Sequence, residues 1–254
     1  MQIASTPSII PIRTVPAVGN TTAVKCSNCH LRELCVPSGL EDTDVQRLDA
    51  LTFGRRRVKA GDALFHQGEK FHFVYAVRSG TFKTAITLAD GGEQVTGFRM
   101  GGEFMGLDGL ARGVHDNTAI ALEDGEVCSI PFAHLAELAP FSRALQMLVG
   151  RLMSREIVRD QTLLVLLASM NAEERVAAFV LNVSQRMRAR GYSEREFHLR
   201  MDRRDIGSYL GMKIETVSRT LSAFQQRRLL EVDKKHIRIL DLEGLNAQFG
   251  ERLQ

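Results

Sequence analysis

The sequence contains no long apolar run, which excludes several classes of protein. None of its stretches approaches the roughly 18 consecutive apolar residues that a transmembrane helix requires, so we expect no membrane partner. The first twenty residues contain one basic residue, Arg13, and no apolar block with a cleavage site, so we expect no signal peptide and a cytoplasmic protein. A Ser–His–acid set, a phosphate-binding loop and a metal–water motif are also missing, so we do not expect an enzyme.

Cysteine is scarce, and four residues are too few for a disulfide scaffold in a chain of 254. Their placement is uneven: Cys26, Cys29 and Cys35 lie close together, whereas Cys128 stands alone far downstream. The remaining composition, with 44% hydrophobic and 25% charged residues, is typical of a globular chain with a core. Its length fits two domains of ordinary size.

The net charge of +3 is small, but it is unevenly distributed. Lys and Arg outnumber Asp and Glu in residues 171–254, whereas residues 1–170 carry a slight acidic excess. The last third is therefore where we expect a surface that binds a polyanion.

The sequence pattern of the first half of the chain changes at about residue 52. Residues 1–25 indicate an arm without periodic structure, and residues 41–51 show a short helical pattern. From 52 to 131, short segments with alternating apolar residues are separated by glycines, which predicts an all-β sandwich or barrel. The triplet Asp90-Gly91-Gly92 between two such segments indicates a hairpin.

Residues 140–169 predict a long helix. Alternating steps of four and three along it define one stripe, which consists of Gln146, Gly150, Met153, Ile157, Asp160, Leu164 and Leu167. This spacing is typical of a coiled-coil seam, so we expect the helix to pair with its copy in a second chain. Burial of the helix within one chain is the alternative. A carboxylate at Asp160 would destabilise such a seam through desolvation and repulsion by its twin. Asp160 either lies at the solvated edge of the contact or keeps the dimer marginally stable. In the second case we expect Asp160→Ala to form dimers without a ligand.

The last third predicts a winged helix-turn-helix. Residues 171–190 form an amphipathic pattern, 203–210 and 214–228 form two helices around a turn at Gly211-Met212-Lys213, and 230–240 resemble a β wing.

The second of these helices has two distinct faces. Val217, Leu221 and Phe224 form the face expected to be buried, and the opposite face carries Glu215, Ser218, Arg219 and Ser222. In a major groove, Arg219 can bind guanine, Glu215 can accept from a cytosine amine, and Ser218 can contact a base or phosphate. The residues expected to contact phosphates are Thr216, Lys213, Arg203, Lys234 and Lys235. The alternative is a solvated face with a structural Glu–Arg pair.

The four cysteines favour a metal centre. Cys26, Cys29 and Cys35 on an irregular segment, joined by Cys128 from a later strand, supply four soft ligands that suit an iron–sulfur cluster or zinc. The spacing fits a cluster better than the paired knuckles of structural zinc, although His30 adds a possible zinc ligand. A redox thiol switch, or a buried Cys128 without a ligand role, remains open.

These motifs, in this order, resemble the CRP/FNR superfamily of bacterial transcription regulators, and specifically its oxygen-sensing FNR type (also called ANR or Btr-like). The resemblance covers nearly the whole chain, from Cys26 to Leu245. Its segments are the four cysteines and residues 156–161 (EIVRDQ), 171–175 (NAEER), 205–211 (DIGSYLG) and 215–219 (ETVSR). It implies an α+β fold with an N-terminal β jelly-roll sensor domain of the cyclic-nucleotide-binding type, a long dimerisation helix and a C-terminal winged helix-turn-helix. The corresponding boundaries are 1–39 for the arm with the cysteines, 40–138 for the β-roll, 139–170 for the helix and 171–254 for the DNA-binding domain.

The resemblance also implies a mechanism. Cys26, Cys29, Cys35 and Cys128 would carry one oxygen-labile [4Fe–4S] cluster per subunit, and the cluster would promote a homodimer that binds a palindrome resembling TTGAT-N4-ATCAA. Glu215, Ser218 and Arg219 would read bases. Met153, Ile157, Asp160, Leu164 and Leu167 would form the dimer contact. Leu34 would cover the cluster, and a loop near residues 89–92 would contact RNA polymerase, so that genes of anaerobic metabolism are activated or repressed.

The sequence departs from the cyclic-nucleotide-binding members at one point. Gly102-Glu103 matches their Gly-Glu turn, but the Arg-Ser pair that follows it in those members is replaced by Asn117-Thr118. Without that arginine a cyclic phosphate loses its bidentate cation. We therefore do not expect a cyclic nucleotide as ligand.

Overall fold

The computed structural model describes residues 25–35, 43, 45–46, 49, 54–133 and 143–249. The predicted arm up to residue 24, most of the helical pattern at 41–51 and the predicted helix start at Pro140 lie outside these residues. Within the described part of the chain, no helix is both long and apolar enough to cross a bilayer.

Residues 54–131 form two antiparallel four-stranded sheets, called here the β domain. One sheet has the order β1-β8-β3-β6 and the other β2-β7-β4-β5. The strands are β1 Gly54–Val58, β2 Ala63–Phe65, β3 Phe73–Ser79, β4 Thr81–Thr87, β5 Glu93–Met100, β6 Phe104–Met105, β7 Thr118–Ala121 and β8 Gly125–Pro131, with a 3-10 turn, η2, at Leu107–Leu110. Apolar side chains of both sheets, such as Phe65, Val77, Phe82 and Val127, fill the space between them. The predicted β-roll is confirmed, as is the hairpin at residues 90–92 between β4 and β5.

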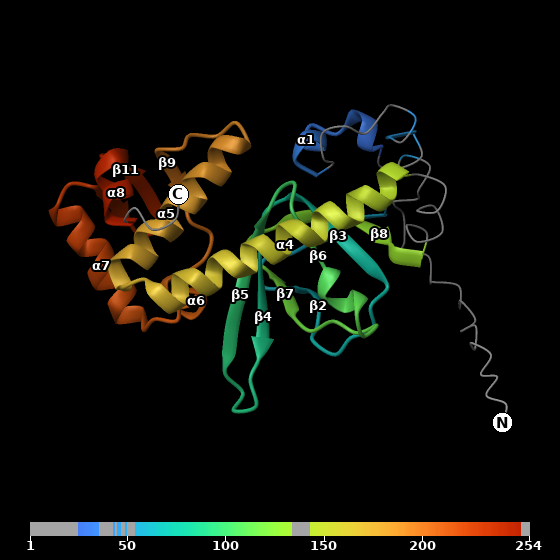
Figure 1. The fold of residues 1–254 in the computed structure, drawn as a ribbon, viewed down its shortest axis with the longest axis horizontal. Coiled ribbons are helices and arrows are strands. Elements are labelled where there is room, and N and C mark those ends of the chain that lie inside the picture. Colours follow the sequence, from blue (N-terminus) through green and yellow to red (C-terminus); the bar gives the residue numbers. More distant parts are fainter. Residues whose placement is uncertain are drawn as a thin grey trace, which may run out of the picture.

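Strand β3 is buried on both faces, which its alternating pattern did not predict. Tyr75 and Val77 of β3 point into the β domain, and Val74 and Ala76 on the other face are buried as well. They are covered by α4 (Arg143–Ser169), whose Leu148 and the neighbouring Leu152 pack against them. The long helix therefore lies across the outside of the β1-β8-β3-β6 sheet (Figure 1).

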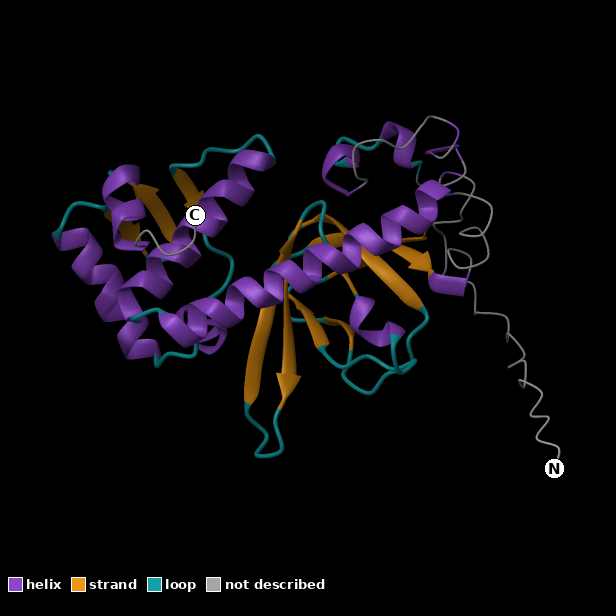
Figure 2. Cartoon of the chain, viewed as in Figure 1, coloured by secondary structure: helices purple, strands orange, loops and turns teal. Residues whose placement is uncertain are grey.

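Residues 172–249 form a second unit, called here the winged domain. Its elements are α5 Ala172–Ala189, β9 Glu196–His198, α6 Arg203–Leu210, α7 Ile214–Gln226, β10 Leu230–Asp233, β11 His236–Ile239 and α8 Leu242–Phe249. Asn171 starts α5 with a capping box, in which its side chain accepts from Glu174 N while the Glu174 carboxylate accepts from Asn171 N. Gly211 ends α6 with a φ of +62°, as the predicted turn requires. Figure 2 shows this helical domain at one end of α4.

The winged domain confirms the predicted helix-turn-helix and differs from it in two details. The wing is a three-stranded sheet of order β10-β11-β9, because β9, which carries Phe197, joins the two predicted strands. Helix α7 ends at Gln226 rather than at Arg228, whose φ of +56° cannot continue a helix.

We predict that Gly80→Ala destabilises the β domain far more than Gly61→Ala. Both glycines have a positive φ, +84° and +86°, so each substitution costs about 1–2 kcal/mol in backbone strain. At Gly80 alone, an added Cβ would lie 2.9 Å from Cα of Gly125, on the backbone of the neighbouring strand. Urea unfolding followed by circular dichroism measures both changes, and equal losses would contradict the prediction.

Candidate cysteine site and nucleic-acid interface

Helix α7 presents the predicted base-reading residues to solvent. Val217, Leu221 and Phe224 are buried, as predicted. Glu215, Ser218 and Arg219 are exposed on the other side, within the first two turns. Arg219 donates only a long hydrogen bond of 3.4 Å to Thr216 Oγ1, so its guanidinium can turn toward a base edge.

The residues predicted to contact phosphates lie in two places. Lys213 and Thr216 are at the start of α7, with Lys213 exposed, and Lys234 and Lys235 form the tight turn of the wing. Arg203, the first residue of α6, is bound to the second of these places, because its Nη2 donates to the carbonyl of Lys234 at 3.0 Å. The structure thus gives Arg203 a role in holding the wing against α6, in addition to the predicted one.

The cysteine segment (residues 25–35) lies near Cys128 of β8. It consists of η1 (Cys26–Asn28) and α1 (Arg32–Cys35), and Cys26 and Cys35 pack in the same apolar cluster as Cys128. That cluster also contains Leu148 and Leu152 of α4. The predicted convergence of the two distant cysteine groups therefore occurs directly under the first turns of the long helix.

The electrostatics of the thiols reflect this shared location. Burial raises the pKa of Cys26 to about 12, and the charges of Asp49, Cys128 and Cys29 add to the effect. Burial also raises the pKa of Cys35 to about 12, with contributions from Cys29, Cys128 and Cys26, while Arg190 opposes it. The pKa of Cys128 is raised by burial and by Cys29.

All four thiols are partly buried and free of disulfides. In the described ranges, no three His, Cys, Asp or Glu side chains are grouped closely enough to hold a single metal ion. The donor set is still chemically suited to an iron–sulfur cluster, because four cysteines are the ligands such clusters use. His30, the alternative nitrogen ligand, is exposed.

The predicted dimer face of α4 is largely uncovered. Met153, Ile157 and Leu164 are 44%, 54% and 65% exposed, and Asp160 is exposed between them. Leu167 differs, because it is partly buried and packs against the core of the winged domain. The helix therefore has one apolar side on the β domain and a second apolar side that the described residues leave exposed.

An ionic cluster around Glu103, called here the arginine clamp, was not predicted from the sequence. Glu103 is the last residue of the β5–β6 turn, and its carboxylate binds Arg186 of α5 at 2.7 and 3.0 Å and Arg190, the C-cap of α5, at 2.6 Å. Arg159 of α4 lies 3.8 Å from it. The side chains of Glu103 and Arg190 are only 13% and 8% exposed. An arginine pair at i and i+4 on α5 was the available signal, but its partner is 83 residues away in sequence.

Burial of Glu103 opposes its ionisation, but the three arginines outweigh this effect. Arg186, Arg159 and Arg190 lower its pKa from 4.5 to about 2. The Glu103 carboxylate is therefore ionised and held by arginines of α4 and of the winged domain. Asn117, in the place of the missing arginine, accepts a hydrogen bond from Thr96.

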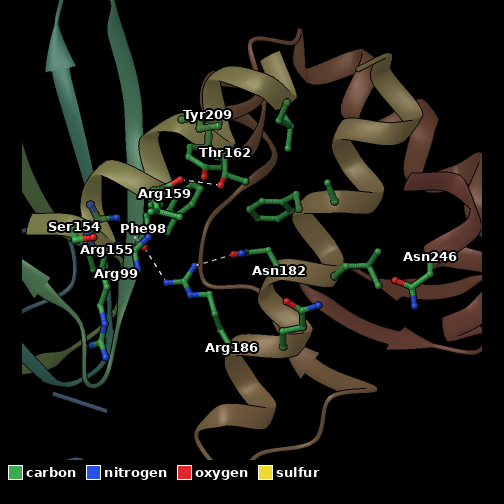
Figure 3. Close-up of a pocket in the computed structure, with 17 residues that line it drawn as sticks. Phe98, Arg99, Ser154, Arg155, Arg159, Thr162, Asn182, Arg186, Tyr209 and Asn246 are labelled. Atoms are coloured by element: carbon green, nitrogen blue, oxygen red, sulfur yellow. Dashed lines mark hydrogen bonds between the residues drawn. The ribbon is translucent and has the colours of Figure 1, made fainter. Parts of the chain in front are cut away.

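A cavity of about 810 Å³ lies beside the clamp, where β5, α4, α5 and α6 meet (Figure 3). In Figure 3, Arg186 extends from α5 toward β5 and donates to the carbonyl of Phe98 at 2.9 Å. Phe98 also contacts Phe179 and Tyr209 through its ring. The two domains thus meet through a shared apolar core, to which β5 contributes Val95, Phe98 and Met100, and through ion pairs beside the cavity.

Comparison with known proteins agrees with this architecture. The family model of the cyclic nucleotide-binding domain matches residues 55–139, and that of the Crp-like helix-turn-helix domain matches residues 174–248. The chain is 45% identical to the transcriptional activator protein FnrA of Stutzerimonas stutzeri, over 89% of this chain and 92% of that one. It belongs to the CRP/FNR family of transcription regulators.

Two further proteins support the assignment to the CRP/FNR family. The anaerobic regulatory protein of Haemophilus influenzae is 42% identical over 88% of this chain and 87% of its own. The structure of FixK2 from Bradyrhizobium japonicum superposes with a TM-score of 0.73, at 26% identity, over 78% of this chain and 98% of that one. As a CRP/FNR regulator the protein is a DNA-binding transcription factor and not an enzyme, as predicted.

We predict that Arg219→Ala and Lys234→Ala weaken DNA binding in different ways. Loss of a base-reading arginine should reduce the binding free energy for the specific site by about 1–3 kcal/mol and change the affinity for random DNA little. Loss of Lys234 should weaken both equally and reduce the salt dependence by about one phosphate contact. Fluorescence anisotropy at several salt concentrations separates the two patterns, and the same pattern for both variants would refute the assignment.

We also predict that Glu103 makes the fold sensitive to acid. Since its pKa is about 2 in the folded chain and 4.5 ordinarily, its contribution is complete above pH 4.5 and is lost as the pH falls toward 2. Between pH 5 and pH 3 the wild type should lose about 2 kcal/mol more free energy of unfolding than Glu103→Gln. Urea unfolding at each pH tests this, and parallel pH curves would disprove it.

Proposed function

We propose that this protein is an FNR-type regulator whose DNA binding is controlled by oxygen. In this proposal Cys26, Cys29, Cys35 and Cys128 hold one oxygen-labile [4Fe–4S] cluster per subunit. The observation that carries it is the packing of the cysteine segment and Cys128 in one apolar cluster with Leu148 and Leu152 of α4. A ligand held by these cysteines acts directly on the helix that carries the dimer face.

The cluster supplies a centre that oxygen dismantles. The chain's own residues supply the response. With the four thiolates tied together, the cysteine segment stays against β8 and under Leu148, which favours the position of α4 across the sheet. Leu34 at the edge of the segment is partly buried and limits the access of oxygen. When the tie is lost, the segment is free to leave, and α4 loses part of its support.

Dimerisation follows from the exposed apolar side of α4. Pairing with a second copy buries Met153, Ile157 and Leu164, which stabilises the dimer by about 25 cal/mol for each Å² of apolar surface removed from water. Asp160 on the same face opposes pairing through desolvation and repulsion by its twin. Such a dimer is marginal, so a coupling of about 1–3 kcal/mol from the cysteine segment is sufficient to control it.

The homodimer accounts for a palindromic operator. Two α7 helices related by a two-fold axis enter successive major grooves, about one helical turn apart. Glu215, Ser218 and Arg219 then read one half-site each, in a palindrome of the type TTGAT-N4-ATCAA. Genes of anaerobic metabolism are the proposed targets, consistent with the name of the Haemophilus influenzae relative. The protein would act in the cytoplasm, as an activator or a repressor.

Two parts of the surface complete the proposal. The hairpin between β4 and β5 projects from the β domain (Figure 2), so residues 89–92 are available for contact with RNA polymerase. A cyclic nucleotide is not the proposed ligand, because Glu103 is bound by arginines and Asn117 by Thr96.

Anaerobic purification tests the cluster. We expect visible absorption with iron and sulfide in the wild type, and loss of absorption, of the dimer and of operator binding in air. Cys128→Ser should lack the absorption and anaerobic operator binding. Ser129→Ala, the neighbouring residue on the other face of β8, serves as the control for general damage to the strand and should retain both.

The rival proposals give different results in the same experiment. A zinc protein would be colourless, would contain stoichiometric zinc and would ignore air. A thiol switch would contain no metal and would respond reversibly to a thiol oxidant. Anaerobic operator binding by Cys128→Ser equal to that of the wild type would overturn the cluster proposal and leave the DNA-binding function intact.

A further inference from the structure

The cysteine segment touches a second structure besides α4, namely the turn between β5 and β6. An added Cβ on Gly102 would lie 2.5 Å from Cβ of Leu34, and one on Gly101 would lie 3.4 Å from Cδ1 of Leu31. The segment therefore rests directly on this turn, at a place where only glycine leaves room. The φ of +85° at Gly102 also requires glycine.

The same turn is bound to the winged domain on its other side. Arg190 Nε donates to the carbonyl of Gly101 at 2.8 Å, and Glu103 holds Arg186 and Arg190 in the clamp. In Figure 1, α1 and the C-terminal end of α5 lie on the same side of α4. Three consecutive residues, Gly101 to Glu103, thus connect the cysteine segment with the first helix of the DNA-binding domain.

This connection does not use the side chains of the dimer face. The closest partners of Glu103 are Arg186 of α5 and Arg190, the C-cap of α5. Arg159 of α4 lies 3.8 Å from Glu103, whereas Met153, Ile157 and Leu164 lie on the exposed side of α4. The rest of the contact between the two domains consists of a shared apolar core, with Val95, Phe98 and Met100 of β5, and of a cavity of about 810 Å³ beside the clamp. A buried charged clamp beside a cavity can hold the winged domain in one orientation and release it when the turn shifts.

We infer that Glu103 is a positioning residue that transmits the state of the cysteine segment through the Gly101–Glu103 turn to the winged domain of the same subunit. When the segment is seated, Leu34 and Leu31 fix the turn, and the clamp holds α5 in the orientation that DNA binding requires. When it leaves, the turn loosens and α5 is released. The cysteine state thus controls how each subunit presents α7, in addition to whether two subunits pair. The inference rests on the proposed function.

The experiment compares Glu103→Gln with a matched control, Glu123→Gln. Glu123 also forms an ion pair between the two domains, at 3.1 Å with Arg200, and its side chain accepts from Thr81 Oγ1 rather than binding the described cysteine segment. Each full-length protein is purified without oxygen. Iron content, visible absorption and dimer fraction are measured first, followed by hydrogen exchange of residues 186–190 and operator affinity, before and after air.

In the wild type and in Glu123→Gln, the presence of the cluster should slow hydrogen exchange at residues 186–190 and strengthen operator binding. In Glu103→Gln, absorption and dimer fraction should stay as in the wild type, while the slowing disappears and the loaded dimer binds the operator about tenfold more weakly. Arg186→Gln, which opens the clamp from the winged domain, should reproduce this result.

The outcomes are distinguishable from failure of the proposed function. A wild type without iron would overturn both proposals. The inference alone would be overturned if the wild type contains the cluster and both Glu103→Gln and Arg186→Gln show the same slowing of exchange and the same operator affinity as the wild type. Equal losses in Glu103→Gln and Glu123→Gln would also overturn it, because the clamp would then contribute only general contact between the domains.

Discussion

The structure depends on the packing of Leu148 and Leu152 of α4 against the outer face of the β1-β8-β3-β6 sheet. This contact decides which side of the helix is buried and hence which apolar side is left exposed. It also covers Val74 and Ala76 of β3 and encloses Cys128 on β8. The proposed cluster site and the proposed dimer face therefore lie on one helix, the first on its buried side and the second on its exposed side. In this proposal a change in the cysteine segment has only to act across one helix to affect pairing.

The arginine clamp consists of buried ion pairs, whereas the contact of α4 with the sheet is apolar. Burial of a lone carboxylate is costly, and Glu103 is stabilised only because Arg186 and Arg190 approach it together, with Arg159 nearby. Such a contact depends on its geometry, since moving the arginines away leaves the buried carboxylate with less compensation for its lost hydration. Apolar contacts in contrast weaken gradually as surface is exposed. The joint between the β domain and the winged domain is therefore sensitive to the position of the arginines, which is what a switch requires.

The sequence was sufficient to predict those features that repeat along the chain. The buried face of α7, the Gly211 turn and the alternating strands around the residue 90–92 hairpin each follow a local period, and the structure confirms them. The clamp was not predictable, because Glu103 and Arg186 are brought together only by the docking of two domains. The burial of both faces of β3 was missed for the same reason. The meeting of Cys128 with the cysteine segment was expected from ligand chemistry and from family resemblance, not from any local pattern.

If the cysteine segment acts both on α4 and on α5, each connection needs to supply only part of the coupling free energy. If the cysteine segment acted on α4 alone, the whole change in operator affinity would have to come from the monomer–dimer equilibrium. If it also orients α5 in each subunit, the effect enters once per subunit, because both half-sites need a correctly presented α7. Two modest couplings of about 1–3 kcal/mol then multiply in the equilibrium constant and give a steep response. The position of Glu103, adjacent in sequence to the glycine that Leu34 covers, is the physical basis for this second contribution.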